Sequence, residues 1–385
     1  MADRLRKKVE EAKKALDAKA KKAADDSAKA KAAQDSAKQA PAGAATAQPA
    51  GGPAQPATAD PKVWDNYDFV PGSRVIFYTD FSEDKVGNFA RRLKYVGGPM
   101  DVVERDGVRM LRSTGRSTFL IPLGRQLPER FTLEFDIIPV SVGGYELMSF
   151  EGGAQMDRGP KSAHVHWHTN GTLIIGSGQD AGNSPVRIPE AMQPLLIGKL
   201  VHVRVLMDGP YFKMYTNERR MYNIPELSFK RDSVIRVFVN GGEESGRAVY
   251  LASIRVAESE TDVLYDALST KGRWATQGIL FATGKADLQP ESRPVLKEIA
   301  AVLKDHDDLR ILIEGHTDNV GKPDANLALS DARAAAVKAA LVAQFGVAGD
   351  RITTKGLGDT KPTVPNATAE GRAQNRRVEI VKQRH

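Results

Sequence analysis

Hydrophobic positions along the chain follow two contrasting patterns. Between residues 62 and 257, short apolar runs are separated by Gly, Pro and Asn, and no helical periodicity intervenes. Many short strands at this spacing are typical of an antiparallel β-sandwich. The predicted strands are residues 74–78, 109–111, 118–121, 131–138, 145–150, 164–168, 172–175, 202–207, 211–215, 235–239 and 249–256.

Strand and helix patterns alternate in a second domain, predicted over residues 278–385. Pro290 suits the start of a helix, and Gly346, directly after Phe345, suits the end of one. This alternation predicts an α/β sandwich in which helices pack on one sheet. The predicted strands are residues 278–281, 309–313, 351–355 and 377–381, and the predicted helices are residues 290–304 and 324–345.

The remaining segments contain few large apolar residues. Residues 1–40 are rich in Ala, Lys and acidic residues, which favours a helical arm that is solvated or at best weakly self-associating. Residues 41–61 are mainly Ala, Pro, Gly, Gln and Thr, and they predict a disordered linker because they cannot bury enough surface to fold. The polar segment 258–277 is predicted to link the two folded domains.

Composition limits the classes of protein to consider. The chain has 385 residues, enough for two domains plus extensions. It has no cysteine, which excludes disulfides, thiolate metal sites and cysteine catalysis. The formal net charge of +7 suits anionic partners such as acidic glycan, lipid headgroups or nucleic acid, but it ranks none of them. No run of about 18 apolar residues occurs, so we predict no membrane-spanning helix.

Polar residues concentrate in the stretch from Glu314 to Arg333, between a predicted strand and a predicted helix. Ligands favour this end of an α/β sheet. Asp318 lies in the loop, and Arg333 lies four residues before Val337 in the helix, on the row expected to face the core. Such an acidic and basic pair suits a zwitterion, because the carboxylate binds an ammonium and the guanidinium binds a carboxylate. A structural salt bridge between the two residues is the alternative.

A series of motifs runs from Ile279-Leu280-Phe281 through Glu314-Gly315-His316-Thr317-Asp318 to the run from Glu370 to Ile380. On these motifs, residues from about 278 to 383 strongly resemble the OmpA-like peptidoglycan-binding domain of outer-membrane proteins, Pal lipoproteins and flagellar stator proteins. The resemblance covers roughly a quarter of the chain. It implies that Asp318 and Arg333 bind the amino and carboxylate ends of diaminopimelate in the cell-wall stem peptide. The marks that carry it are Ile279-Leu280-Phe281, Glu314-Gly315-His316-Thr317-Asp318, Asn326, Leu329-Ser330, Arg333-Ala334, Gly356-Leu357-Gly358, Asn366 and the run from Glu370 to Ile380.

Several polar residues near this pair have two interpretations. Thr317 and Asn319 flank the aspartate and either contact the peptide or brace the loop. His316 is either a packed imidazole or a contact. Asn326 and Ser330 are expected to hold the start of the helix. For Arg372, Arg376 and Arg377 we expect structural pairing, with contact to glycan as the alternative.

Phrases in the first domain, such as residues 131–137, 202–209 and 211–218, resemble core strands of concanavalin A-like or laminin G-like jelly rolls. Jelly-roll glycosidases place carboxylates on one strand face, because retaining hydrolysis requires an acid and a nucleophile about 5 Å apart. In the run from Glu134 through Asp136, Ile138 stands where the third carboxylate belongs. We therefore predict that the protein is not an enzyme.

The strand 164–168 carries the other candidate chemistry of this domain. His164, His166 and His168 alternate and share one face, so they are weak candidates for a Zn²⁺ site. An exposed polar face or a sugar-facing strand is the alternative, and we predict no metal. Trp167 and Tyr145 are candidates for stacking against sugar rings, with burial in the sandwich as the alternative.

We therefore expect noncovalent binding of peptidoglycan that anchors the sandwich to the wall, without a cofactor or nucleic acid. The alternative is a wall-anchored lectin or adhesin whose sandwich binds polysaccharide. The expected location is the periplasm or the outer membrane. The first residues lack the apolar core of a signal peptide, so we expect that a signal was removed or that the true start lies upstream.

Overall fold

The computed structural model describes residues 67–139, 146–155, 163–168, 172–177, 186–187, 198–227, 229–241, 248–259 and 264–383. For 146–147, 163–168, 172–177 and 186–187 only the backbone is described. The predicted arm (1–40) and disordered linker (41–61) lie outside these residues.

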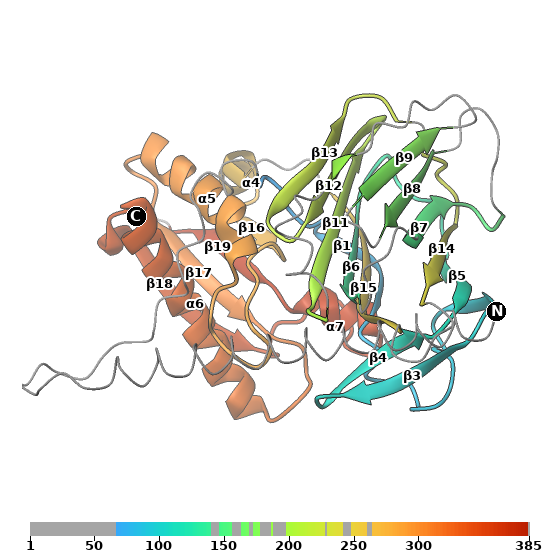
Figure 1. The fold of residues 1–385 in the computed structure, drawn as a ribbon. Coiled ribbons are helices and arrows are strands. Elements are labelled where there is room, and N and C mark those ends of the chain that lie inside the picture. Colours follow the sequence, from blue (N-terminus) through green and yellow to red (C-terminus); the bar gives the residue numbers. More distant parts are fainter. Residues whose placement is uncertain are drawn as a thin grey trace, which may run out of the picture. The chain divides into compact units, whose positions relative to one another are not determined.

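Two antiparallel sheets form the first folded region, which we call the two-sheet region (Figure 1). The larger sheet has the strand order β13 (Arg219–Ile224), β12 (Tyr211–Thr216), β11 (Val201–Asp208), β6 (Arg130–Ile138), β15 (Val249–Glu258), β4 (Val108–Ser113) and β3 (Met100–Arg105), with β1 (Arg74–Thr79) also paired to β15. The smaller sheet has the order β10 (Val186–Arg187), β9 (Thr172–Ser177), β8 (Ala163–His168), β7 (Glu146–Gly152), β14 (Val234–Asn240), β5 (Arg116–Pro122) and β2 (Lys94–Gly97).

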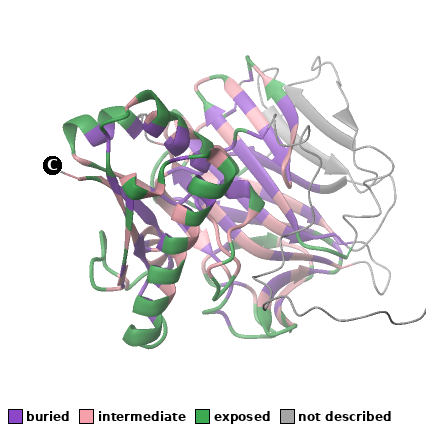
Figure 2. Cartoon of the chain, turned by 90° about the vertical axis from the view of Figure 1, so that its left-hand side faces the viewer, coloured by how far each residue is buried: buried purple, intermediate pink, exposed green. Residues whose placement is uncertain are grey.

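One hydrophobic core joins the two sheets. Alternate residues of β6, from Phe131 to Ile137, are fully buried in it, while Glu134 and Asp136 point to the opposite face of the sheet. The rings of Phe135 on β6 and Phe150 on β7 lie 5.8 Å apart between centroids and link the sheets directly. In Figure 2 the buried positions run through these strands. The jelly-roll likeness of this region stays a prediction.

The second folded region contains a four-stranded sheet with the order β16 (Arg273–Thr276), β19 (Val378–Lys382), β17 (Ile311–His316) and β18 (Ile352–Gly358). Strands β17 and β18 are parallel, and the other pairs are antiparallel. The helices are α4 (Leu264–Thr270), α5 (Arg293–Asp305), α6 (Pro323–Phe345) and α7 (Ala369–Asn375), with short 3₁₀ turns at Pro290–Ser292 and Gly349–Arg351. A second core forms where Ile299, Val337 and Leu341 from the helices meet Ile313 and Ile380 from the sheet.

Most predicted strands and both predicted helices match observed elements within a few residues. The prediction of a strand at 278–281 is wrong. This apolar run forms only one bridge, between Phe281 and Leu288, and it buries Ile279 in the core without joining the sheet. The fourth strand is instead β16, which lies at the edge of the sheet within the segment 258–277 that we expected to be only a linker.

Two further differences have a clear cause. Helix α4 also lies in the expected linker, where the short apolar set Leu264, Ala267 and Leu268 is enough to attach it to the core. Helix α7 was not predicted because it is short and contains Gly371, but the hydroxyl of Thr368 accepts a hydrogen bond from the Gly371 amide (3.0 Å) and caps its start.

Candidate functional site

The loop between β17 and α6 is held close to the sheet by glycines. A Cβ atom on Gly315 would lie 2.2 Å from the Ser330 carbonyl oxygen, and one on Gly356 would lie 2.4 Å from the Asp331 backbone nitrogen. Only glycine permits this approach of α6 to β17 and β18. The result is that residues 317–322 and the first turns of α6 converge at one edge of the sheet, as the sequence predicts.

Asp318 is buried in this loop, with 8% of its surface exposed. Its Oδ1 accepts a hydrogen bond from the Val320 amide (3.0 Å), and its Oδ2 pairs with Nη1 of Arg376 (2.6 Å). Its backbone carbonyl accepts hydrogen bonds from the Thr317 hydroxyl (2.8 Å) and from the Asn326 side-chain amide (3.2 Å). The carboxylate therefore has a fixed position.

Arg333 projects from α6 and is partly buried beside the core residues Val337 and Leu341. Its Nε donates a hydrogen bond to the Lys285 carbonyl (3.0 Å), and its guanidinium lies 5.0 Å from the centroid of the Phe281 ring. No carboxylate among the described residues forms an ion pair with it. Burial, together with the positive charge of Arg376, lowers the pKa of Arg333, and the charge of Asp318 only partly opposes this. Arg333 is thus a partly desolvated cation whose positive charge no neighbouring carboxylate fully offsets.

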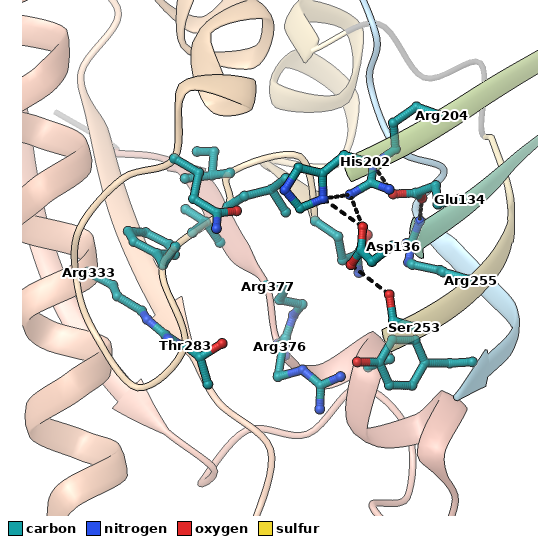
Figure 3. A pocket seen from close by; sticks show the side chains of 18 of the residues that line it. Glu134, Asp136, His202, Arg204, Ser253, Arg255, Thr283, Arg333, Arg376 and Arg377 are labelled. Atoms are coloured by element: carbon teal, nitrogen blue, oxygen red, sulfur yellow. Dashed lines mark hydrogen bonds and ion pairs between the residues drawn. The ribbon is translucent and has the colours of Figure 1, made fainter. Parts of the chain in front are cut away.

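A cavity of about 350 Å³ opens beside Arg333 (Figure 3). Its carboxyl-terminal wall includes Thr283, Arg333, Arg376 and Arg377. Its second wall comes from the outer face of the larger sheet, where the lining residues are Glu134, Asp136, His202, Arg204, Ser253 and Arg255. Asp318 is not among the residues that line the cavity, but it forms an ion pair with Arg376, which does line it.

Strand register assembles the second wall. Arg204 and Arg255 lie directly opposite Glu134 on the neighbouring strands, and His202 and Ser253 lie opposite Asp136. The guanidinium of Arg204 pairs with Asp136 (2.8 Å) and Glu134 (3.4 Å).

Every carboxylate of this wall has partners. Glu134 pairs with Arg255 (2.5 Å), and Asp136 accepts from the Ser253 hydroxyl (2.7 Å) and contacts Nδ1 of His202 (2.7 Å). Burial opposes ionisation of Asp136, but Arg204, His202 and Ser253 outweigh it and hold the pKa of this carboxyl below its usual range. The two carboxylates and two guanidiniums of this wall balance one another.

The carboxyl-terminal wall is not balanced in this way. Asp318 pairs with Arg376, and Glu379 pairs with Arg377 (2.5 Å), as expected for structural arginines. Arg333 then leaves one positive charge facing the cavity without an ion-pair partner among the described residues. This arrangement can bind an anion, and a carboxylate suits a guanidinium best because it can accept two parallel hydrogen bonds.

A group of possible metal ligands lies next to the cavity. Side-chain atoms of Glu314, His316 and Glu379 lie within 4.8 Å of one another. However, Glu379 also pairs with Arg377 and with Arg273 (3.0 Å), and these two guanidiniums oppose a cation. His316 is buried with neither ring nitrogen hydrogen-bonded, and burial lowers its pKa to about 4. It is a packed neutral imidazole.

The remaining candidates fall into two groups. Thr317 is buried and its hydroxyl braces the loop, whereas Asn319 is exposed at the loop surface. The side chains of His164, His166, His168 and Trp167, and all of Tyr145, lie outside the described residues. The metal and sugar-stacking hypotheses for these five residues stay predictions.

Sequence reasoning missed the second wall of the cavity and the position of Tyr78, which also lines it. The alternation of Glu134 and Asp136 is visible in the sequence, but by itself it suggests only a hydrolase pattern. Arg204, which lies in the predicted strand 202–207, is the residue that could have indicated an ion-pair network with these carboxylates.

Comparison with known proteins identifies the second folded region. Residues 280–376 match the OmpA family. Peptidoglycan-binding protein ArfA of Mycobacterium tuberculosis (strain ATCC 25618 / H37Rv) is 50% identical over 103 residues, which cover 27% of this chain and 31% of that protein. The probable lipoprotein YiaD of Escherichia coli (strain K12) is 44% identical over 102 residues, which cover 26% of this chain and 46% of that protein.

Among solved structures, the peptidoglycan-associated lipoprotein from Burkholderia pseudomallei is 34% identical, and the alignment covers 32% of this chain and 100% of that chain with a TM-score of 0.28. The chain spans less than half the length of the two curated relatives. Several relatives are named as outer-membrane proteins, including porin F of Pseudomonas aeruginosa. On the family match, the carboxyl-terminal part of this chain contains an OmpA-family domain at residues 280–376.

Proposed function

We propose that the OmpA-family domain binds peptidoglycan noncovalently and thereby anchors the two-sheet region to the cell wall. The observation that carries this proposal is the Arg333 guanidinium, which lies within the family match, is partly desolvated, has no ion-pair partner among the described residues, and lines the cavity. The names of the relatives support it, since ArfA is called a peptidoglycan-binding protein. No enzymatic step is part of this function.

The ligand chemistry is that of diaminopimelate in the stem peptide. Its carboxylate would bind Arg333, whose Nε is occupied by the Lys285 carbonyl while the terminal nitrogens remain for a ligand. Its ammonium would bind Asp318, because two carboxylate oxygens offer about four acceptor positions and the Val320 amide and Arg376 use two of them. A zwitterion thus matches both charges of the site.

The proposed location is the periplasmic side of the outer membrane, where the wall is accessible. Relatives named as outer-membrane proteins support this location. In the part of the chain that the structure describes, no helix is long and apolar enough to cross a membrane.

Calorimetric titration of the full chain with a diaminopimelate-containing muropeptide tests the function. Arg333→Ala and Asp318→Ala should each weaken binding by about 2–5 kcal/mol, because each leaves a desolvated ligand charge without its partner. Arg293→Ala is the matched control, since Arg293 also lies on a helix with its guanidinium near an aromatic ring (Phe345, 5.7 Å) but does not line the cavity. Wild-type affinity in Arg333→Ala would refute the assignment.

A further inference from the structure

Strand β1 of the two-sheet region is attached to helix α7 of the OmpA-family domain through its backbone. The Val75 amide donates to Oε1 of Gln374 (2.6 Å), and Nε2 of Gln374 donates to the Ser73 carbonyl (2.5 Å). The Tyr78 amide donates to Oε1 of Glu370 (3.1 Å). Side chains of α7 therefore satisfy backbone groups along β1 that would otherwise lack partners.

Ion pairs reinforce this attachment. Arg92 pairs with Glu370, and Arg372 pairs with Glu83. Each pair joins one residue from the two-sheet region to one residue of α7. Backbone hydrogen bonds and two ion pairs thus act together on this seven-residue helix.

Arg376, the residue directly after α7, is held from both sides. Its Nη1 pairs with Oδ2 of Asp318 (2.6 Å), which belongs to the OmpA-family domain. Its guanidinium also lies 5.1 Å from the centroid of the Tyr78 ring, which belongs to β1. Burial raises the pKa of Tyr78 to about 12, so the ring stays neutral and presents an intact face to the cation.

Arg376 and Tyr78 both line the cavity beside Arg333. The positive charge of Arg376 repels that of Arg333 and contributes to lowering the pKa of Arg333. The two guanidiniums are therefore close enough to interact electrostatically. Asp318 supplies one negative charge against the two positive charges of Arg333 and Arg376. An anion in the cavity would neutralise the remaining positive charge. The position of Arg376 therefore matters for any anion that Arg333 binds.

We propose that the two-sheet region completes the peptidoglycan site: Tyr78 positions the Arg376 guanidinium so that Arg376 and Arg333 act together on the ligand carboxylate. This inference rests on the proposed function. It makes Tyr78 a positioning residue, since its ring acts on the ligand only through Arg376. The wall-binding site is then shared between two folded regions of the chain, although the family match begins only at residue 280.

The test compares variants of the full chain by calorimetry with the same diaminopimelate-containing muropeptide. Tyr78→Ala should weaken binding by roughly 3- to 10-fold, the range expected for a partly desolvated cation–π contact. Tyr78→Phe should bind within about 2-fold of wild type, because it keeps the ring and loses only a long hydrogen bond to Asp80 (3.4 Å). Tyr95→Ala, which removes an exposed tyrosine outside the cavity, is the control and should bind normally.

A double-mutant cycle separates positioning from general structural damage. If Tyr78 acts through Arg376, adding Tyr78→Ala to Arg376→Ala should change affinity by less than about 2-fold. If Tyr78→Ala does not fold, Tyr78→Leu serves instead, because it fills the space without a π face and should show the same loss.

Three results would overturn the inference: wild-type affinity in Tyr78→Ala or Tyr78→Leu, tighter binding in either, or additive losses in the cycle. Tighter binding would mean that the two-sheet region obstructs the site. Arg333→Ala distinguishes these outcomes from failure of the proposed function. If it loses binding while Tyr78→Ala does not, the function stands and only the positioning role fails.

Discussion

The cavity is bounded by two walls that handle charge differently. On the wall formed by β6, β11 and β15, Glu134 and Asp136 are matched by Arg204 and Arg255 at hydrogen-bonding or ion-pair distance. On the wall formed by the OmpA-family domain, Arg333 faces the cavity with no carboxylate partner among the residues that the structure describes. Removing one member of a balanced buried network destabilises the folded state, because it leaves a charge without its partner. A partly buried cation that already lacks a counter-charge is expected where a ligand supplies the missing charge.

The largest expected effect comes from breaking the balanced wall. Arg204 is 6% exposed, and Arg204→Ala would leave the buried Glu134 and the partly buried Asp136 without their shared partner. We expect a loss of about 3–5 kcal/mol in the free energy of unfolding, measured by urea denaturation.

Arg105→Ala is the control for this prediction. Arg105 also lies on a strand of the larger sheet and contacts an aromatic ring (Tyr250, 5.2 Å), but its side chain is 40% exposed. Its removal should cost less than about 1 kcal/mol. If Arg204→Ala is no less stable than Arg105→Ala, Glu134 and Asp136 do not depend on Arg204 for compensation of their charge.

The sequence predicts different features of the two walls. The strict alternation from Phe131 to Ile137 predicts a strand with Glu134 and Asp136 on the other face, because side chains alternate across a strand. The motif around Asp318 and Arg333 likewise predicts one side of the cavity. Neither pattern indicates that the two faces line one cavity, because that depends on contacts such as Val75 to Gln374, between residues far apart in the chain.

The errors at the edges of the sheets have a similar cause. Strand β16 reads Arg273-Trp274-Ala275-Thr276, and only Thr276 is buried, so no apolar run announces it. The run at 278–281 is apolar, yet its apolar side chains serve packing within a loop. Hydrophobicity indicates burial, and it does not by itself distinguish a strand from a buried loop.

An intermediate effect is expected from the neutral histidine on the OmpA-family side. Burial lowers the pKa of His316 to about 4, below its usual value near 6.5. Between these values the unfolded chain binds a proton that the folded chain does not, so stability is full above about pH 6.5 and falls as the pH decreases towards 4. This single group should contribute roughly 1–3 kcal/mol to the fall.

His316→Leu provides the measurement, because leucine fills a buried site without titrating. The difference in unfolding free energy between wild type and variant should depend on pH between about 6.5 and 4, with the wild type losing more. A constant difference across this range would mean that His316 is protonated in the folded state. It would then act as a partner of Glu379, which lies 3.7 Å from its Nε2.

The smallest effect distinguishes two explanations of why the OmpA-family wall attracts an anion. Arg333→Lys keeps the positive charge but loses the planar fork, the hydrogen bond from Nε to the Lys285 carbonyl and the contact with Phe281. If the site recognises a carboxylate by two parallel hydrogen bonds, affinity for muropeptide should fall by about 1–1.5 kcal/mol, roughly 5- to 10-fold. If the excess charge alone attracts the ligand, the lysine variant should bind like wild type. Its affinity should then decrease more steeply with added salt than expected for recognition by two hydrogen bonds. The first result would assign the specificity of the wall to the geometry of Arg333, and the second would assign it to the unbalanced charge of the cavity.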